Sequence, residues 1–346
     1  MLGAEQVVVY FAPLRALREG LGNRHITSRK VRKAQREDAH QILLFRRDVP
    51  NVRLVFIKGP TRGQRMPIAL PKTEPRSFER VREHYSIEKE LAARLRSATK
   101  EERRHLYSAV YDELFQRVPD HPQLTRKLDT ALRRREVRER LRLLRRYLHR
   151  EATYLEIGPG DCALAVEAAR RVRTAFAVDV SREVASGAHL LKNLDLVITD
   201  GSSIPVPAGT VDIAYSDQLM EHLHPDDAVE QVRSIHDVLS PGGIYICITP
   251  NRWSGPHDIS RYFDDEATGF HLREYTVAEL ATMFREAGFA RVQVLVGSGG
   301  VHVPMAVRVV TALERGLQRL PRNVGRRLAR QLPLRMILGA KVLARK

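Results

Sequence analysis

The chain has 346 residues, 43% of them hydrophobic, which suffices for one large domain or two smaller ones with a sizeable core. Since no stretch of about 18 residues is free of charge, and no basic flank precedes the first apolar run, we expect neither a transmembrane helix nor a secretory signal. The two cysteines, Cys162 and Cys247, exclude a disulfide framework and a cysteine zinc site and indicate a reducing, cytoplasmic location.

The net charge of +17 is unevenly distributed over the four parts that we predict. Residues 1–75 form a poorly defined basic extension, 76–150 a helical cover, 151–300 an α/β core, and 301–346 a basic amphipathic insert with the final strand of the core. Residues 1–150 carry a net charge of +18, the core −11 and the insert +10. The basic arms could attract nucleic acid, an anionic lipid surface or an anionic substrate, or could be solvated helix faces only.

The extension contains two apolar, β-favouring runs, at residues 41–45 and 52–57. The intervening sequence Asp48-Val49-Pro50-Asn51 is typical of a turn, so the runs predict a hairpin. We find no motif there that carries chemistry.

The helical cover is indicated by a change in apolar period after Ser77. Thr99 and Glu102 form a capping box that opens one helix. A second helix carries an apolar stripe made of Val137, Leu141, Leu144 and Leu148. We expect these helices to cover an edge or mouth of the domain that follows.

The most informative stretch runs from Tyr154 to Cys162, Y-L-E-I-G-P-G-D-C. Its apolar run stops at Gly158-Pro159-Gly160, and a helical pattern follows from Asp161 onward. This sequence predicts a buried strand, a tight glycine turn and a helix. Such a turn lets the backbone approach a ligand closely and directs helix N–H groups toward it.

Further apolar strands then alternate with helical patterns. The strands are expected at residues 175–180, 194–199, 211–215, 243–249 and 292–296. Near-continuous apolar strands separated by helices predict a parallel sheet that is covered on both faces. Acidic residues follow three of these strands, at Asp179, at Asp200-Gly201 and at Asp217, on the edge where such sheets bind ligands.

The glycine turn also fits a dinucleotide-binding pattern. Gly158 to Ala163 reads G-x-G-x-x-A, and Asp179 lies near the expected spacing for a ribose-binding acid, so an NAD(P)-dependent oxidoreductase is an alternative. Three features argue against it. Glu156 lies inside the strand, where a carboxylate is costly unless it is hydrogen-bonded. A second acid, Asp200, follows the strand after the one that ends at Asp179. The last two strands are separated by a long helical insert.

These motifs, in this order over about 140 residues, resemble those of the class I S-adenosylmethionine-dependent methyltransferases, in particular the type-11 group. Glu156-x-Gly158-x-Gly160 resembles the first motif of the family, with Cys162 where a third glycine is usual. The stretch from Val211 to Leu223 is similar to the family's F-D-x-V…L-E-H-L sequence. Pro241-Gly242-Gly243 matches its turn before the fifth strand.

The resemblance implies a Rossmann-like α/β fold with a seven-stranded sheet, helices on both faces and a helical N-terminal region in front. It also implies a final antiparallel strand at Lys341 to Arg345 and S-adenosylmethionine as cofactor. In the family, an acid at the position of Asp179 binds the ribose hydroxyls, and one at Asp200 meets the adenine amino group. The residues expected at the cofactor are Glu156, Gly158, Gly160, Asp179, Asp200, Gly201 and Asp217.

A metal ion is not predicted. His222 and His224 could be read as metal ligands together with Asp226. The resemblance implies instead that His222 belongs to the scaffold.

The acceptor side of the site is expected in the polar and aromatic loop that follows residues 243–249. Methyl transfer requires that donor and nucleophile be held in line and that water be excluded, and a hydroxyl or carbon acceptor also needs a base. We predict His257 or His271 as this base. The predicted acceptor contacts are Trp253, Arg261, Tyr262 and Tyr275. Alternatively, this is a structural loop whose histidines pair with Asp258 and Glu274.

The C-terminal insert has an apolar helical face surrounded by arginines. This face consists of Ala306, Val310, Leu313, Leu317 and Leu320. Such a helix can lie on an anionic membrane surface, form a dimer contact or act as a lid. We favour the lid, because the insert joins two adjacent strands near the ligand-binding edge.

Together these features predict a methyltransferase whose acceptor is unidentified. A small molecule, lipid or glycan is favoured over nucleic acid, since aromatic residues make up only 6% of the chain and are not interleaved with basic ones. Peripheral membrane contact through the C-terminal basic helix is a further expectation. A second hypothesis is a non-catalytic, methyltransferase-like binding protein that engages nucleic acid or a membrane through its basic arms.

Overall fold

The computed structural model describes residues 41–43, 56–58, 70–71, 74–124, 130–181 and 191–346. The chain divides into two units, Met1–Ile68 and Ala69–Lys346. In the first unit, β1 (Gln41–Leu43) and β2 (Phe56–Lys58) pair antiparallel, with Ile42 opposite Ile57. These strands lie in the two runs expected to form a hairpin, whose connecting residues 44–55 are outside the described residues.

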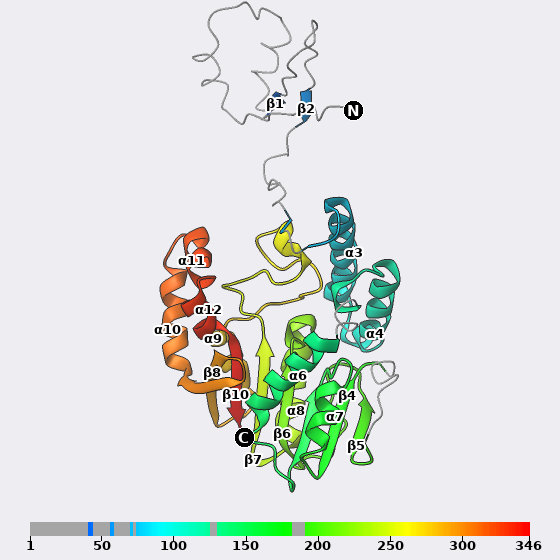
Figure 1. Cartoon of the computed structure of the whole chain (residues 1–346), viewed down its shortest axis with the longest axis vertical. Coiled ribbons are helices and arrows are strands. Elements are labelled where there is room, and N and C mark those ends of the chain that lie inside the picture. Colours follow the sequence, from blue (N-terminus) through cyan, green and yellow to red (C-terminus); the bar gives the residue numbers. More distant parts are fainter. Residues whose placement is uncertain (1–40, 44–55, 59–69, 72–73, 125–129, 182–190) are drawn as a thin grey trace, which may run out of the picture. The chain divides into compact units, whose positions relative to one another are not determined.

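The second unit is built on an eight-stranded mixed sheet (Figure 1). Its strands are β3 (Thr153–Ile157), β4 (Thr174–Asp179), β5 (Leu194–Ile198), β6 (Val211–Asp217), β7 (Leu239–Thr249), β8 (Arg291–Ser298), β9 (Val301–Ala306) and β10 (Ala340–Arg345). Their order in the sheet is β5-β4-β3-β6-β7-β10-β8-β9. The first five in this order are parallel, β10 is antiparallel to both of its neighbours, and β9 is antiparallel to β8.

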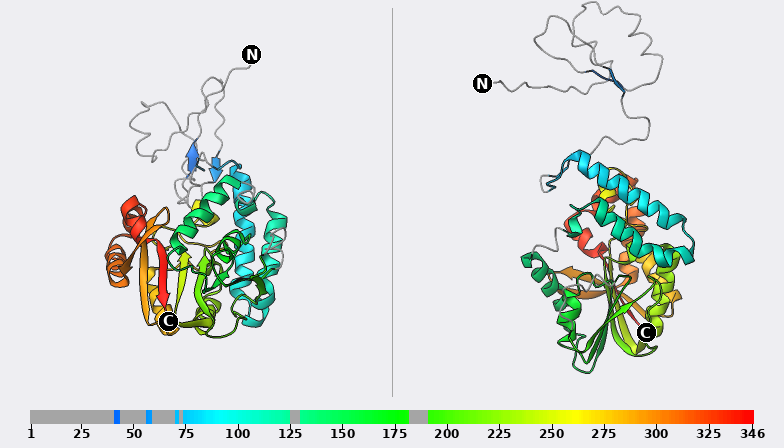
Figure 2. Two further views of the ribbon diagram at one scale, coloured as in Figure 1. Left: turned by 60° about the horizontal axis from the view of Figure 1, so that its bottom comes forward. Right: turned by 90° about the vertical axis from the view of Figure 1, so that its right-hand side faces the viewer.

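Helices cover both faces of this sheet and its carboxyl edge (Figure 2). They are α3 (Phe78–Ser97), α4 (Lys100–Arg117), α6 (Thr130–Leu144), α7 (Ala163–Ala169), α8 (Pro225–Val238), α9 (Val277–Glu286), α10 (Val307–Gln318), α11 (Arg322–Ala329) and α12 (Leu332–Leu338). Two short 3₁₀ helices are η2 (Met220–His222) and η3 (Ile259–Tyr262). In Figure 1, α10 to α12 lie beside β8 at one side of the sheet, and α3 and α4 lie at the opposite side.

The core lies on both faces of the sheet, which explains why the parallel strands are almost uniformly apolar. All five residues of β3 are buried. Leu155 and Ile157 belong to a large apolar cluster with α3, α4, α8 and α9, whereas Tyr154 belongs to a second cluster with α6 and α7. Successive side chains of one strand therefore enter opposite halves of the core.

The ends of two helices follow the sequence signals for capping. Thr99 accepts a hydrogen bond from the N–H of Glu102, and the Glu102 carboxylate accepts one from the N–H of Thr99. Thr276 and Glu279 form the same reciprocal pair at the start of α9. The structure thus confirms the capping box predicted for Thr99 and Glu102.

The C-terminal insert differs from the predicted single helix. Residues 301–306 form the edge strand β9, because the Gly299-Gly300 turn, with φ of +59° and +86°, returns the chain along β8. Three helices then follow, and of the predicted apolar face Ala306 and Leu320 are exposed. The sheet thus has one strand more than the seven expected, while the predicted antiparallel strand β10 is confirmed between β7 and β8. Among the described residues, no helix combines the length and apolarity needed to cross a membrane.

Candidate active site

The glycine turn joins β3 to α7 in an unusual backbone conformation. Gly158, Gly160 and Cys162 all have positive φ, of +67°, +61° and +58°. A Cβ atom on Gly158 would lie 3.1 Å from the Leu219 side chain, whereas one on Gly160 would meet no atom within 4 Å. The glycines therefore serve the left-handed backbone, and Gly160 leaves the turn open to a ligand. Cys162, at the position of the usual third glycine, is buried and adopts this conformation as a non-glycine residue.

Parallel pairing brings the predicted carboxylates to one edge of the sheet. Ile157 of β3 pairs with Val178 of β4 and with Ser216 of β6. Gly158, Asp179 and Asp217, which follow these three residues, consequently lie at the same edge. Such an edge is where open α/β sheets bind their ligands.

Glu156 is the acid inside β3. Its side chain is buried, and Oε2 accepts a hydrogen bond from the Tyr154 hydroxyl at 3.2 Å. Burial raises the pKa of Glu156 to about 8. The buried carboxyl of Glu156 therefore has the hydrogen bond that its burial calls for. It lies two residues before the glycine turn.

Asp200 follows β5 and organises its own loop. Oδ1 accepts hydrogen bonds from the backbone N–H groups of Ser202 and Ser203, at 3.0 and 2.8 Å. Burial raises the pKa of Asp200, but these bonds and those from the two serine hydroxyls outweigh it and hold the pKa at about 2. The carboxylate is thus ionised at neutral pH. Arg104 of α4 lies beside it, with Nε 3.4 Å from Oδ2.

The helical cover closes over two further positions of this edge. Gly201 has a φ of +92°, and a Cβ atom there would lie 2.9 Å from the ring of Tyr107 on α4. At the end of β6, Asp217 Oδ2 accepts hydrogen bonds from Arg140 Nε of α6 at 2.5 Å and from the Tyr215 hydroxyl at 3.1 Å. Residues from α4 and α6 thus contact the edge of the sheet that carries the predicted cofactor residues.

The two predicted bases meet at one buried carboxylate, Glu274. Its Oε1 accepts hydrogen bonds from His271 Nδ1 at 2.8 Å and from the backbone N–H of His257 at 2.7 Å, and His257 Nδ1 lies 3.3 Å away. Burial lowers the pKa of His271, but Glu274, Glu221 and Asp258 outweigh it and raise the pKa to about 8. His257 is the more accessible of the two, with its Nε2 3.1 Å from Ser254 Oγ. The alternative interpretation of this loop paired the histidines with Asp258 and Glu274, and in the structure both contact Glu274.

The predicted acceptor contacts have different surroundings. Tyr262 packs against α3 in a small apolar cluster with Val81, and the exposed Arg261 lies over its ring. Tyr275 is buried, and its hydroxyl has no hydrogen-bond partner among the described residues. Trp253 lines a pocket of about 490 Å³ bounded by α9, α10 and α11, together with four arginines: Arg252, Arg315, Arg322 and Arg326. Of the predicted acceptor contacts, Trp253 alone lines this pocket.

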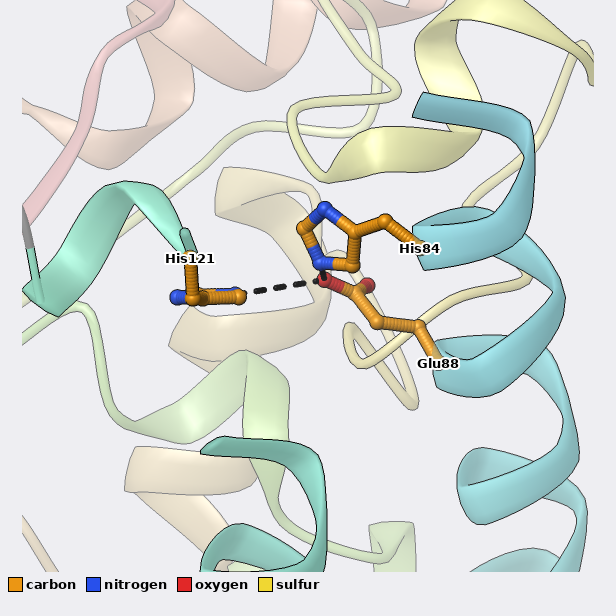
Figure 3. A group of neighbouring side chains, drawn as sticks. All are labelled: His84, Glu88 and His121. Carbon is orange, nitrogen blue, oxygen red and sulfur yellow. Dashed lines mark hydrogen bonds and ion pairs between the residues drawn. The ribbon is translucent and has the colours of Figure 1, made fainter. Parts of the chain in front are cut away.

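Among the described residues, two clusters contain the residue types that bind metal ions. In the first, Glu88 of α3 lies between His84 of the same helix and His121, which follows α4 (Figure 3). The Nδ1 atoms of both histidines face donors, the Arg76 guanidinium at 2.9 Å and the N–H of Gln123 at 3.2 Å. Each ring therefore carries its proton on Nε2 and donates it toward Glu88, so this cluster is a hydrogen-bonded scaffold.

The second cluster consists of Glu221, His222 and His271, at the carboxyl ends of β6 and β7. The predicted alternative metal set does not form the same group, since His224 caps α8 by accepting a hydrogen bond from the N–H of Asp226.

Several residues of the site were not identified from the sequence. Arg104 and Arg140 appeared only as members of basic helices, and Glu221 only as part of a motif. Glu314 of α10 is buried and accepts hydrogen bonds from the N–H groups of Val277 and Ala278, so it caps α9 from another helix. The sequence does contain a signal for Glu314, because it is the only acidic residue among residues 301–346.

The central part of the chain is similar to known methyltransferases. Residues 128–294 match a family model described as a methyltransferase domain. A probable S-adenosylmethionine-dependent methyltransferase of Mycolicibacterium smegmatis is 32% identical over 141 residues, which are 39% of this chain and 51% of that protein. A protein of the same description from Mycobacterium tuberculosis is 30% identical over 139 residues, 40% of this chain and 48% of that protein. The chain thus spans about half the length of the curated relatives it matches.

Among solved structures, a SAM-dependent methyltransferase from Aquifex aeolicus is 19% identical to this chain with a TM-score of 0.37. The match covers 46% of this chain and 87% of that one.

Proposed function

We propose that the chain transfers a methyl group from S-adenosylmethionine to an acceptor, because residues 128–294 match a methyltransferase-domain model. The observation that supports this most strongly lies inside the matched region. The open glycine turn after β3 and the carboxylates after β4, β5 and β6 lie at one edge of the sheet. An acid beside the ribose and another beside the adenine fix the donor without reacting, which is the positioning that an in-line displacement requires.

In this proposal Asp179 binds the ribose hydroxyls and Asp200 meets the adenine amino group. Asp200 suits this role because its loop holds it ionised, with Oδ1 engaged by the loop and Oδ2 directed toward α4. Glu156, Gly158 and Gly160 contact the methionine part of the donor. Gly201 and Asp217 complete the wall of the donor site.

For an acceptor that must lose a proton, we propose His257 as the base. About a third of its side chain is exposed, whereas His271 is nearly buried, and Glu274 orients both rings. A base must reach the proton it removes, so accessibility favours His257. Trp253, Arg261, Tyr262 and Tyr275 remain candidate acceptor contacts.

The donor assignment is tested by calorimetric titration of the full chain with S-adenosylmethionine, S-adenosylhomocysteine and NADH. We expect micromolar binding of the first two and none of NADH. Binding of NADH alone would identify the glycine turn as a dehydrogenase site. Binding of none of the three, together with a salt-sensitive affinity for nucleic acid, would favour the non-catalytic binding protein.

A specific observation also supports a peripheral contact with an anionic membrane surface. Large apolar side chains of the insert are exposed, including Val301 at 75% and Leu332 at 71%. Arginines are interspersed with them: Arg308, Arg319, Arg327 and Arg335 are all exposed or partly exposed. Exposed apolar residues combined with basic ones bind the interface of anionic bilayers. A contact with lipid would suit a lipid acceptor, and the two free, buried cysteines suit the reducing cytoplasm.

This contact is tested by sedimentation with vesicles of phosphatidylglycerol and phosphatidylcholine. We expect binding to the anionic vesicles that weakens with salt and is reduced in Leu332→Ser. Equal recovery in the supernatant with and without anionic vesicles would contradict the proposal. Dimer formation that is lost in the same variant would identify the insert as an interface instead.

A further inference from the structure

The cluster of Glu221, His222 and His271 has a composition suited to metal binding. Its hydrogen bonds determine which ligand atoms are available to a metal ion. Glu221 and His222 belong to η2, directly after β6, and His271 lies in the loop after β7. One ligand atom of each side chain lies within 4.8 Å of the other two. Glu221 and His271 are buried, and His222 is partly buried.

In both histidines the hydrogen bonds engage Nδ1, which leaves Nε2 as the nitrogen that a metal ion would bind. His222 Nδ1 lies 3.0 Å from the carbonyl oxygen of Phe270, and His271 Nδ1 lies 2.8 Å from Glu274 Oε1. A carbonyl and a carboxylate oxygen only accept, so each Nδ1 must carry the proton and donate it. Nε2 of a neutral ring then presents a lone pair. A carboxylate or carbonyl behind the imidazole is the usual support of a metal-binding histidine.

The carboxylate of Glu221 supplies an independent observation. Its side chain is completely buried, and Oε2 accepts a hydrogen bond from the Thr249 hydroxyl at 2.8 Å. Oε1 is buried without a hydrogen-bond partner among the described residues. A buried acceptor without a partner costs about 1–3 kcal/mol, and more when it is charged. A cation next to Oε1 removes this cost.

We propose that Glu221, His222 and His271 bind a divalent transition-metal ion. Two imidazoles and one carboxylate suit Zn²⁺, Mn²⁺ or Fe²⁺ better than Mg²⁺ or Ca²⁺, which prefer oxygen ligands. Bonds of about 2.0–2.2 Å place ligand atoms about 3–3.5 Å apart. The three ligand atoms, which lie within 4.8 Å of one another, would take up these separations around the ion.

Three protein ligands leave at least one coordination position open. Open positions distinguish catalytic from structural metal sites. The cluster follows β6, at the sheet edge that carries Asp217, and the ring of Tyr111 on α4 packs against His222. The open position would accept water or an oxygen of a hydroxyl-bearing acceptor, a role that rests on the proposed methyltransferase function. Binding of the ion does not rest on it.

The cluster of His84, Glu88 and His121 provides an internal control. It has the same residue types, but its imidazoles direct Nε2 protons at the carboxylate, and Glu88 Oε2 also accepts a hydrogen bond from the N–H of Phe270. A metal there would require both rings to move their protons and lose the contacts with Arg76 and Gln123. Of these two clusters, the Glu221 cluster should bind an ion more tightly.

The test uses the full chain after treatment with a chelator, titrated with Co²⁺ by visible absorption and with Zn²⁺ by calorimetry. We expect one equivalent to bind and the melting temperature of the wild-type chain to rise with added ion. Glu221→Gln and His222→Gln should lose most of this binding. Glu274→Gln, which removes the support of His271, should weaken it by about 10–100-fold. His84→Gln should bind the ion as the wild type does.

Three results would overturn the proposal: no binding to the wild-type chain, unchanged affinity in Glu221→Gln, or a loss confined to His84→Gln. The stabilisation of the wild-type chain by the ion is informative even if a variant fails to fold. S-adenosylmethionine titrated into the metal-free chain separates the two proposals. Metal binding without donor binding would support the metal site and contradict the proposed methyltransferase function. Donor binding without metal binding would support the methyltransferase function and contradict the metal site.

Discussion

Arg103 of α4 and Asp227 of α8 form a bidentate ion pair, with Nε 2.6 Å from Oδ2 and Nη2 2.7 Å from Oδ1. Both side chains are almost completely buried, and the Tyr107 hydroxyl donates a third hydrogen bond to Asp227 Oδ2 at 2.6 Å. The pair attaches the helical cover to a helix that packs on the sheet. It also fixes the ring of Tyr107 over Gly201, at the edge where the donor is proposed to bind.

Removal of Arg103 should therefore destabilise the fold strongly. Arg103→Ala leaves the Asp227 carboxylate buried with only part of its hydrogen bonds, and we expect a loss of about 3–5 kcal/mol in the free energy of unfolding. Urea denaturation measures this. The double variant Arg103→Met, Asp227→Leu should recover much of the loss because it leaves no unpaired charge. A loss below about 1 kcal/mol in Arg103→Ala would show that the pair does not hold the cover in place.

Asp179 should be needed for the donor and not for the fold. Asp179→Ala removes a charged acceptor from the proposed ribose position, so we expect S-adenosylhomocysteine to bind about 10–100-fold more weakly. The matched control is Asp195→Ala, an exposed acid on the neighbouring strand β5 away from the carboxyl edge. Calorimetry should find wild-type affinity for that variant. Equal affinities of the two variants would contradict the proposed donor site.

Two glycines with similar backbones should tolerate alanine very differently. Gly201 and Gly209 have φ of +92° and +70°, so alanine is strained at both. Only at Gly201 does the added Cβ meet a neighbour, the Tyr107 ring at 2.9 Å, which its hydrogen bond to Asp227 holds in place. We expect Gly201→Ala to be less stable than Gly209→Ala by about 1–3 kcal/mol, measured by thermal unfolding. Similar stabilities would mean that the ring moves aside.

Acid should destabilise the protein partly through His121. Burial lowers the pKa of His121 below its usual 6.5, although Glu88 opposes this. Because the folded state binds the proton less readily than the unfolded state, stability is retained above pH 6.5 and is lost as the pH falls below it, by at most about 1.4 kcal/mol per pH unit. In His121→Gln, whose amide can still donate to Glu88, the fall in stability between pH 7.5 and 5.5 should be smaller. An identical fall would exclude His121 as a cause.

The sequence predicted the elements that depend on local patterns. The strand, glycine turn and helix around Gly158 were visible because apolar runs, glycines and a helical period follow one another directly. The carboxyl edge could be identified because Asp179, Asp200 and Asp217 each come at or just after the end of an apolar strand. β10 followed from the family resemblance.

Other features depend on partners that are distant in the chain. Arg140 lies among many arginines, and nothing in its neighbourhood indicates that it reaches Asp217. The sequence shows that Glu274 is close to His271 in the chain. Its hydrogen bond to the backbone of His257 depends on the path of the loop. β9 was missed because Pro304 interrupts a short run, although an edge strand tolerates proline and Ser298-Gly299-Gly300 is a hairpin signal.

The position of β10 has a consequence for biosynthesis. This strand lies between β7 and β8 and pairs with both, yet it is synthesised after every other strand of the sheet. While a ribosome is still adding residues 299–339, the facing edges of β7 and β8 both lack their partner, and unpaired edges invite association with other chains. The sheet can close only after Ala340 to Arg345 have emerged from the exit tunnel. Nascent chains arrested before Ala340 should therefore stay sensitive to protease at β8, and completed chains should not.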